Sequence, residues 1–228
     1  NDFIESEWWA LKEIWKKGLL YEGYKVVPYC PRCGTPLSSH EVAQGYKDVT
    51  ERSAMVEFKA KDDDCSFLAW TTTPWTLPSN MALCVNPSVD YVKVQVGDKK
   101  YILAEALVDT VFEGVEGERK VLERYKGKDL EFREYEPLYP FAVKKVKNQR
   151  GKKAFIVTCD DYVTTEDGTG IVHMAPAFGE DDNRVCQKYN VAFVNLVNGK
   201  GELTEETKWA GIFVKKADPM ILKDLKEQ

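Results

Sequence analysis

Short apolar runs bounded by turn residues are the feature that most constrains how this chain folds. Between these runs the sequence lacks the regularly spaced helices that a doubly wound nucleotide-binding fold needs. In one of them Val92, Val94 and Val96 alternate with polar or aromatic residues, and Gly97-Asp98 forms a hairpin turn. Strands are predicted at residues 19–27, 54–58, 66–71, 81–85, 91–96, 99–103, 120–125, 141–146, 154–159, 171–174 and 191–197. The expected fold class is therefore α+β and mainly β, an antiparallel barrel-like sheet with helices packed around it.

Helical periodicity marks both ends of the chain. Ile4, Trp8, Leu11 and Trp15 lie about one helical turn apart, so they form an apolar face that is expected to pack on something large. Further helices are predicted at residues 104–112, 180–189 and 220–228.

The chain opens without a methionine and closes within a predicted helix. We therefore expect a single domain, residues 1–228, excised from a longer protein. Its predicted parts are a lead-in with a helix and a cysteine knuckle at 1–50, a core at 51–214 and an exit helix at 215–228.

Composition narrows the class of protein. With 43% apolar and 12% aromatic residues, the chain can fill a core, which excludes disorder. The net charge of -5 argues against a broad basic face that coats nucleic acid, so any such contact must be local. The six cysteines fit buried thiols in a reducing compartment. No long apolar run or leader is present, and we expect a soluble, cytoplasmic monomer without a membrane partner.

Residues 70–80 are the first segment that can carry chemistry. Thr71, Thr72 and Thr73 follow one another at the end of an apolar strand, before a loop that holds two prolines. Adjacent hydroxyls and free backbone N–H groups at a strand end can bind a polar or anionic group and hold a water. Threonine is also a good strand former, so a purely structural role stays open.

Residues 168–182 are the second such segment. A glycine turn leads into a short strand with His173, and a second glycine precedes a helix whose first turn holds Glu180, Asp181 and Asp182. Carboxylates are stabilised at a helix N-terminus, which is an alternative reason for these acids. A single histidine is more often a packed, hydrogen-bonded residue than a catalytic one.

Together the two segments resemble a known family. Trp-Thr-Thr-Thr-Pro-Trp-Thr-Leu-Pro-Ser-Asn at 70–80 and Gly-Thr-Gly-Ile-Val-His-Met-Ala-Pro-Ala-Phe-Gly-Glu-Asp-Asp at 168–182 closely resemble the signature segments of isoleucyl-tRNA synthetase editing domains. Cys-Pro-Arg-Cys-Gly-Thr-Pro-Leu-Ser at 30–38 resembles the beginning of that insertion. The leucyl and valyl relatives carry an arginine and then Pro-Glu-Thr in the first segment, which favours the isoleucyl family. The Ala-Phe-Gly-Glu-Asp-Asp stretch resembles the eukaryotic cytoplasmic type.

The resemblance implies an activity and its substrate. Editing domains of this family hydrolyse valine wrongly attached to the 3′ end of tRNA(Ile), and the same site is expected to take valyl adenylate. The resemblance gives Asp182 the role of binding the substrate α-ammonium group. It places Thr71, Thr72 and Thr73 at the reaction centre, where they orient the attacking water and hydrogen-bond the carbonyl or the terminal ribose.

The resemblance assigns three more side chains. His173 resembles the residue that walls the side-chain pocket and excludes isoleucine, while Trp75 and Asn80 are candidates for shaping the loop and contacting the adenosine. Because no Ser-His-Asp arrangement is found, we expect direct attack by water without an identified protein base. The chain also lacks the His-x-Gly-His and Lys-Met-Ser-Lys elements of the synthetic ATP site, so it is not expected to aminoacylate.

Two weaker signals leave alternatives open. Cys30 and Cys33 form half of a zinc knuckle, and since zinc takes about four ligands, bound zinc is not expected here; editing itself needs no cofactor. Basic residues gather around a predicted hairpin at Gly151, usually a sign of a solvated loop, with contact to tRNA phosphates as the alternative. The competing functions are a degenerate module that binds the tRNA 3′ end without chemistry, and a zinc-stabilised interaction domain.

Overall fold

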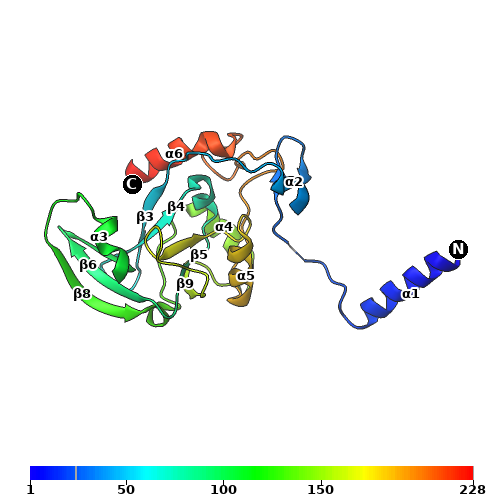
Figure 1. Ribbon diagram of the computed structural model, residues 1–228, viewed down its shortest axis with the longest axis horizontal. Helices are drawn as coiled ribbons and strands as arrows, with labels where there is room; N and C mark the ends of the chain where they lie inside the picture. The colour runs from blue at the N-terminus through cyan, green and yellow to red at the C-terminus, as the bar shows by residue number, and fades with distance from the viewer. Residues whose placement is uncertain (24, 228) are drawn as a thin grey trace.

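The computed structural model describes residues 1–23 and 25–227. Helix α1 (Asp2–Lys16) stands apart at the N-terminus, and a small ribbon lies between it and the main body (Figure 1). The ribbon consists of β1 (Tyr29–Cys30) and β2 (Thr35–Pro36), followed by α2 (Ser39–Ala43). No described residue from 1 to 50 is buried.

The main body is built on one curled sheet. Its strands are β3 (Ala54–Lys59), β4 (Ser66–Thr71), β5 (Ala82–Val85), β6 (Asp90–Val96), β7 (Lys99–Ala104), β8 (Arg119–Lys126), β9 (Ile156–Cys159) and β10 (Ile171–Met174). Their order is β8-β6-β7-β4-β10-β5-β9, with β3 paired to β4. The β4–β10 pairing places the two candidate segments side by side, because Trp70 is opposite Val172.

The predicted α+β, mainly β class is confirmed, with one difference in the sheet. The pairs β3–β4, β5–β10, β6–β7 and β6–β8 are antiparallel, as expected. The pairs β4–β7, β4–β10 and β5–β9 are parallel. In each parallel pair the chain between the partners is long enough to return to the same end of the sheet, which a parallel pairing requires.

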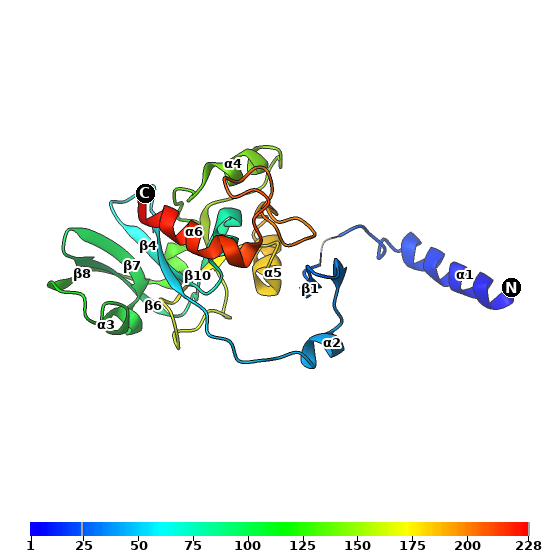
Figure 2. The same cartoon turned by 90° about the horizontal axis from the view of Figure 1, so that it is seen from above.

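Helices surround this sheet. They include α3 (Val108–Val111), α4 (Pro140–Lys147), α5 (Glu180–Lys188) and α6 (Val214–Glu227), together with the 3-10 helices η1 (Pro74–Ser79), η2 (Glu105–Leu107) and η3 (Gly127–Leu130). Seen from above, α6 lies across the side of the body that holds β4 (Figure 2). None of the helices in the described part of the chain has the length and apolarity needed to span a membrane.

Three predicted strands are wrong. Residues 141–146 lie in helix α4, because Pro140 favours the first helical position and lysines favour the last turn. Residues 191–197 make only isolated bridges, at Val191 and Val197. The described residues in 19–27 form no strand, and Tyr24 lies outside the described residues. The predicted C-terminal helix is confirmed as α6, which begins earlier at Val214; Gln228 lies outside the described residues.

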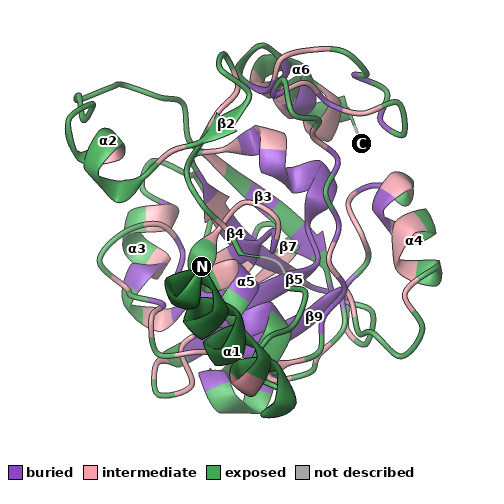
Figure 3. Cartoon of the chain, turned by 90° about the vertical axis from the view of Figure 1, so that its right-hand side faces the viewer, coloured by how far each residue is buried: buried purple, intermediate pink, exposed green. Residues whose placement is uncertain are grey.

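Burial is concentrated in the main body, above all in the strands of the curled sheet (Figure 3). Fully buried side chains include Phe58, Phe67, Leu83, Ile102 and Met174. One close backbone approach requires glycine: at Gly170, with φ of +73°, an added Cβ would lie 2.5 Å from the Cβ of Ala104. This approach places the turn before β10 against the end of β7, where the Ala104 N–H donates to the Thr169 carbonyl (3.0 Å).

Candidate functional site

The threonine segment forms a compact cluster of hydroxyl groups where β4 ends. The backbone N–H of Thr73 donates to Thr71 Oγ1 (3.1 Å), and the two Oγ1 atoms are 3.4 Å apart. Thr76 Oγ1 lies 3.4 Å from Thr73 Oγ1 and donates to the Thr73 carbonyl at 2.8 Å. Thr71 is buried, Thr73 is half-buried and Thr72 is exposed. The structure therefore groups Thr71 and Thr73 with Thr76, which the sequence did not single out, and directs Thr72 to solvent.

His173 is buried in β10 and contacts this cluster through Thr76. Its Nε2 lies 2.8 Å from Thr76 Oγ1, and its Nδ1 lies 2.8 Å from Asn80 Nδ2. Burial lowers the pKa of His173 to about 3, so the ring is neutral at physiological pH. With both ring nitrogens occupied and a low pKa, His173 is unsuited to act as a general base.

Asn80 follows the loop, and its side chain makes three hydrogen bonds within the protein. Its Nδ2 donates to the Ala82 carbonyl (3.0 Å) as well as to His173, and its Oδ1 accepts from the Tyr135 hydroxyl at 2.6 Å. The side chain is 3% exposed. These contacts support the predicted role in shaping the loop, whereas contact with the adenosine stays a prediction.

Asp182 is the third residue of helix α5. Its Oδ2 accepts a hydrogen bond from the backbone N–H of Ala175 (2.8 Å), which ties the helix start to the end of β10. Burial raises the pKa of Asp182 to about 6. Its neighbour Asp181 is exposed and pairs with Arg184 at 3.0 Å. Because a carboxylate can accept several hydrogen bonds, Asp182 keeps acceptor capacity for a cationic group.

Trp75 connects the two segments to each other and to helix α6. Its ring meets that of Phe178 edge to face, with centroids 4.9 Å apart. Its backbone N–H, at the start of η1, donates to Asp218 Oδ1 of α6 at 2.8 Å. Asp218 thus caps η1 from a position 143 residues away. The sequence offered no local signal for this cap.

The cysteine knuckle shows only two thiols in reach of one another. Cys30 Sγ accepts the backbone N–H of Cys33 (3.3 Å), a bond that lowers the pKa of Cys30, and His40 Nε2 lies 2.8 Å from Gln44 Nε2. Within residues 1–23 and 25–227 no cluster of three or more His, Cys, Asp or Glu side chains suited to a metal is found. The donor set therefore does not fit tetrahedral zinc, which takes about four ligands.

The predicted basic hairpin is instead the end of α4 and the turn after it. Lys145 pairs with Glu206 (2.6 Å), Lys152 donates to Asn190, and the Lys153 ammonium lies 4.3 Å from the centre of the Phe132 ring. Three of the basic side chains thus have partners within the protein. Contact with tRNA phosphates stays a prediction.

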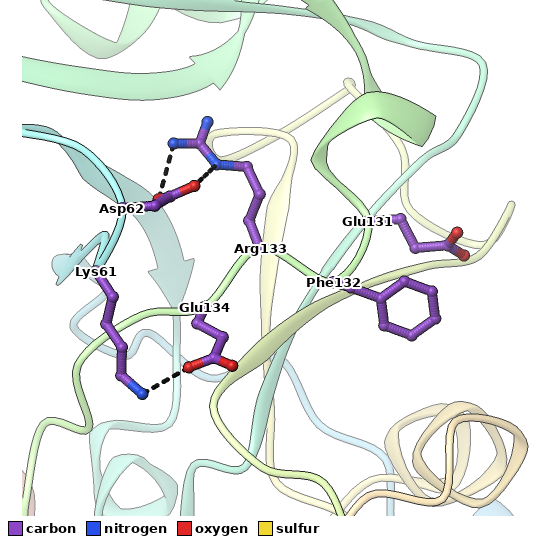
Figure 4. Close-up of a pocket in the computed structure, with 6 residues that line it drawn as sticks. All are labelled: Lys61, Asp62, Glu131, Phe132, Arg133 and Glu134. Atoms are coloured by element: carbon purple, nitrogen blue, oxygen red, sulfur yellow. Dashed lines mark hydrogen bonds and ion pairs between the residues drawn. The ribbon is translucent and has the colours of Figure 1, made fainter.

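Two surface hollows lie outside the candidate site. One, of about 410 Å³, is lined by residues that include Lys61, Asp62, Arg133 and Glu134, which pair among themselves (Figure 4). The other, of about 1120 Å³, runs between β3 and α6. The threonine cluster and Asp182 line neither of these two hollows, so the size of a cavity does not indicate the candidate site. The site is indicated instead by the hydrogen bond between Thr76 of the first segment and His173 of the second.

Comparison with known sequences agrees with the shared motifs. Residues 1–222 match the family model of class I tRNA synthetases (I, L, M and V). The chain is 56% identical to the isoleucine–tRNA ligase of Clostridium acetobutylicum over 229 residues, which are 100% of this chain and 21% of that protein. It is 46% identical to the cytoplasmic isoleucine–tRNA ligase of Mus musculus, over 99% of this chain and 18% of that protein. The chain spans about a fifth of the length of these relatives.

These identities do not support the expected eukaryotic type. Relatives from several Clostridium species, at 52% to 56% identity, are more similar than the mouse protein. The six-residue stretch at 177–182 was too short to distinguish the types.

A solved structure shares the fold. The editing domain of the cytosolic leucyl-tRNA synthetase of P. knowlesi aligns with a TM-score of 0.55 at 15% identity, covering 81% of this chain and 96% of that one. At this identity the similarity shows the architecture alone.

Proposed function

The chain belongs to the class I tRNA synthetase family of the I, L, M and V group, and from this premise we propose that it is an editing domain that removes valine from tRNA(Ile). The observation that carries the proposal is the convergence of the threonine cluster and the segment from His173 to Asp182 at one end of β4 and β10. The proposed partners are the valine-bearing 3′ end of tRNA(Ile) and the remainder of a longer synthetase chain.

A limit on side-chain recognition explains why such a site is needed. A hydrophobic pocket separates isoleucine from valine by one methylene, worth about 1–3 kcal/mol, and isoleucyl-tRNA synthetase is itself the known example, with a ratio of about 150. A second pocket that admits valine, excludes isoleucine and hydrolyses what enters multiplies that selectivity.

Asp182 and the threonines divide the proposed work between binding and orientation. The Asp182 carboxylate accepts the α-ammonium group of the amino acid, a charge-assisted bond that a peptide nitrogen cannot make. Thr71 and Thr73 hold the attacking water against the ester carbonyl, and exposed Thr72 faces the terminal ribose. His173 beneath them, neutral and hydrogen-bonded at both nitrogens, fixes the floor of the side-chain pocket.

The proposed reaction is direct hydrolysis. A water oxygen attacks the ester carbonyl carbon, the bond from that carbon to the ribose oxygen breaks, and the ribose oxygen takes up a proton, leaving free valine and tRNA(Ile). An aminoacyl ester is intrinsically labile, so positioning and carbonyl polarisation supply the catalysis. Binding of the ammonium group occupies the ionised Asp182 carboxylate and so competes with a role as the base.

Deacylation assays test this proposal. We expect the domain to release valine from Val-tRNA(Ile) and to leave Ile-tRNA(Ile) intact, and we expect Asp182→Asn to abolish the release. Asp181→Asn, which changes an exposed carboxylate one residue away, is the matched control and should stay active. Specific binding of Val-tRNA(Ile) without hydrolysis at any protein concentration would favour the degenerate 3′-end binding module instead.

A further inference from the structure

We propose that Tyr135 is a positioning residue that fixes the tautomer of His173 and, through Thr76, the orientation of the threonine cluster. This inference rests on the proposed function for its kinetic consequence only. Tyr135 lies outside both signature segments, 55 residues from Asn80 along the chain. It reaches the site through a chain of buried hydrogen bonds.

The first step is that the Tyr135 hydroxyl is held in one place. The side chain is fully buried between the rings of Phe58 and Phe155, with centroids at 5.3 and 6.2 Å, both edge to face. Its backbone N–H donates to the Phe155 carbonyl at 3.0 Å. Burial raises the pKa of Tyr135 well above its ordinary value, so the hydroxyl stays a neutral donor.

The second step is the direction of each hydrogen bond. Because the Tyr135 hydroxyl donates to Asn80 Oδ1 (2.6 Å), the Asn80 amide nitrogen must face the other way, where it donates to the Ala82 carbonyl and to His173 Nδ1. Nδ1 of His173 is then the acceptor, and the proton of the neutral ring resides on Nε2. Nε2–H donates to Thr76 Oγ1, and the Thr76 hydroxyl donates to the Thr73 carbonyl.

The third step is what the hydroxyl contributes. Two groups hold the Asn80 amide in this orientation, the Tyr135 hydroxyl and the Ala82 carbonyl, and only the former can be removed by substitution. Without it, Asn80 Oδ1 is a buried acceptor with no donor, and a flip of the amide becomes less unfavourable. In the flipped state Nδ1 of His173 carries the proton and Nε2 accepts from the Thr76 hydroxyl. The Thr73 carbonyl then loses the bond from that hydroxyl and keeps only the one from the Thr76 backbone N–H (3.0 Å).

The test combines nitrogen NMR of the histidine ring with deacylation kinetics. The chain has two histidines, and His40 is exposed, so the buried ring of His173 is readily assigned. In the parent protein we expect Nδ1 unprotonated and Nε2 protonated from pH 5 to 8. In Tyr135→Phe we expect a mixture of both tautomers and a fall of about tenfold in kcat for Val-tRNA(Ile), with KM little changed, as for the loss of one buried hydrogen bond.

Tyr91→Phe is the matched control. It also removes a fully buried hydroxyl, which donates to the Gly170 carbonyl at 2.7 Å and accepts from the Asn86 N–H at 2.9 Å, but it leaves the chain from Tyr135 to Thr76 intact. Its tautomer and kinetics should match the parent. A parent protein with the proton on Nδ1, or a folded Tyr135→Phe variant with an unchanged tautomer and unchanged kcat, overturns the proposal. A parent protein that hydrolyses nothing refutes the proposed function, while the NMR result still decides the role of Tyr135.

Discussion

Residues 1–50 and residues 51–227 have equally clear apolar patterns and very different surroundings. In the first region Trp8, Trp9 and Trp15 are 68%, 66% and 71% exposed, and no described residue is buried. In the second, every residue from Pro78 through Val85 is buried (Figure 3). A helical pattern therefore predicts the helix, but whether its apolar face is covered depends on parts that the local pattern does not contain.

The two regions also differ in what holds them in place. Helix α1 has 15 residues and no buried face, and an isolated helix of this length is only marginally stable in water. The cysteine ribbon contacts the surface of the main body, for example where the Tyr29 hydroxyl donates to the carbonyl of the exposed Gly199 (3.0 Å). The candidate site lies wholly in the region with a core, which is where side chains can be held to a fixed geometry.

The largest effect is expected from a cavity in the core. Leu83→Ala removes a fully buried side chain of β5, and we expect the free energy of unfolding to fall by about 2–5 kcal/mol. Trp15→Ala, although it removes more apolar atoms, should change it by less than about 0.5 kcal/mol because the ring is exposed. Urea titration followed by far-UV circular dichroism measures both. A Trp15 effect as large as that of Leu83 would show that α1 docks on the core in solution. The apolar faces of both regions would then be covered, contrary to the difference described above.

An intermediate effect, dependent on pH, is expected at Asp182. Burial raises its pKa to about 6, above the value near 4 of an unfolded aspartate, so ionisation opposes folding. Stability from this group is fully present below pH ~4 and is lost as the pH rises through ~6. We expect Asp182→Asn to stabilise the domain above pH ~7 by about 1–3 kcal/mol relative to its effect at pH ~4, while hydrolysis is lost.

Hydrolysis by the parent protein supplies the other half of that test. It should rise as the pH passes about 6, where Asp182 becomes able to bind an ammonium group. Asp181→Asn removes a smaller contribution to the raised pKa of Asp182, so it should move both the stability profile and this rise slightly toward lower pH and keep the hydrolysis. A stability difference between Asp182→Asn and the parent that does not change with pH would show that the pKa of Asp182 is the same in the folded and unfolded states, and that burial does not oppose its ionisation.

A smaller effect is expected where α6 contacts the site. Asp218→Ala removes the cap on the Trp75 N–H, and we expect a loss of about 1 kcal/mol in stability. Because this N–H opens the 3-10 helix that carries Thr76, hydrolysis of Val-tRNA(Ile) should weaken as well. Asp224→Ala, on the same helix, breaks the ion pair with Lys208 and is a comparison for the loss of a different carboxylate contact of α6. Equal hydrolysis by the Asp218 variant and the parent would mean that the loop is held without α6.

What the sequence could predict follows the same division between local and distant information. Apolar runs and turn residues predicted every strand of the curled sheet to within a few residues. The two motifs supplied Thr71, Thr73, His173 and Asp182 as candidate site residues. The wrong strand at 141–146 arose because apolar residues at 141, 142, 143 and 146 fit a helix as well as a strand in so short a run.

The remaining features depend on register between distant segments. Tyr135 meets Asn80 across 55 residues, and Asp218 meets Trp75 across 143, so neither contact has a local signature. The parallel pairing of β4 with β10 is likewise a property of the assembled sheet, although it is what brings the two motifs together. The candidate reacting groups were thus easier to predict from the sequence than the groups that hydrogen-bond to them.

The smallest effect, close to zero, is expected at the cysteine ribbon. Cys30 and Cys33 supply two thiols, whereas tetrahedral zinc takes about four ligands. No described residue from 1 to 50 is buried, so this region has no core that the ribbon could stabilise. Incubation with a chelator should therefore leave Tm unchanged, and so should the double substitution Cys30→Ser with Cys33→Ser. A clear fall in Tm on chelation of the parent, absent from the double variant, would reveal a metal held at the ribbon. Residues 1–50 would then be stabilised by a bound metal, and residues 51–227 by an apolar core.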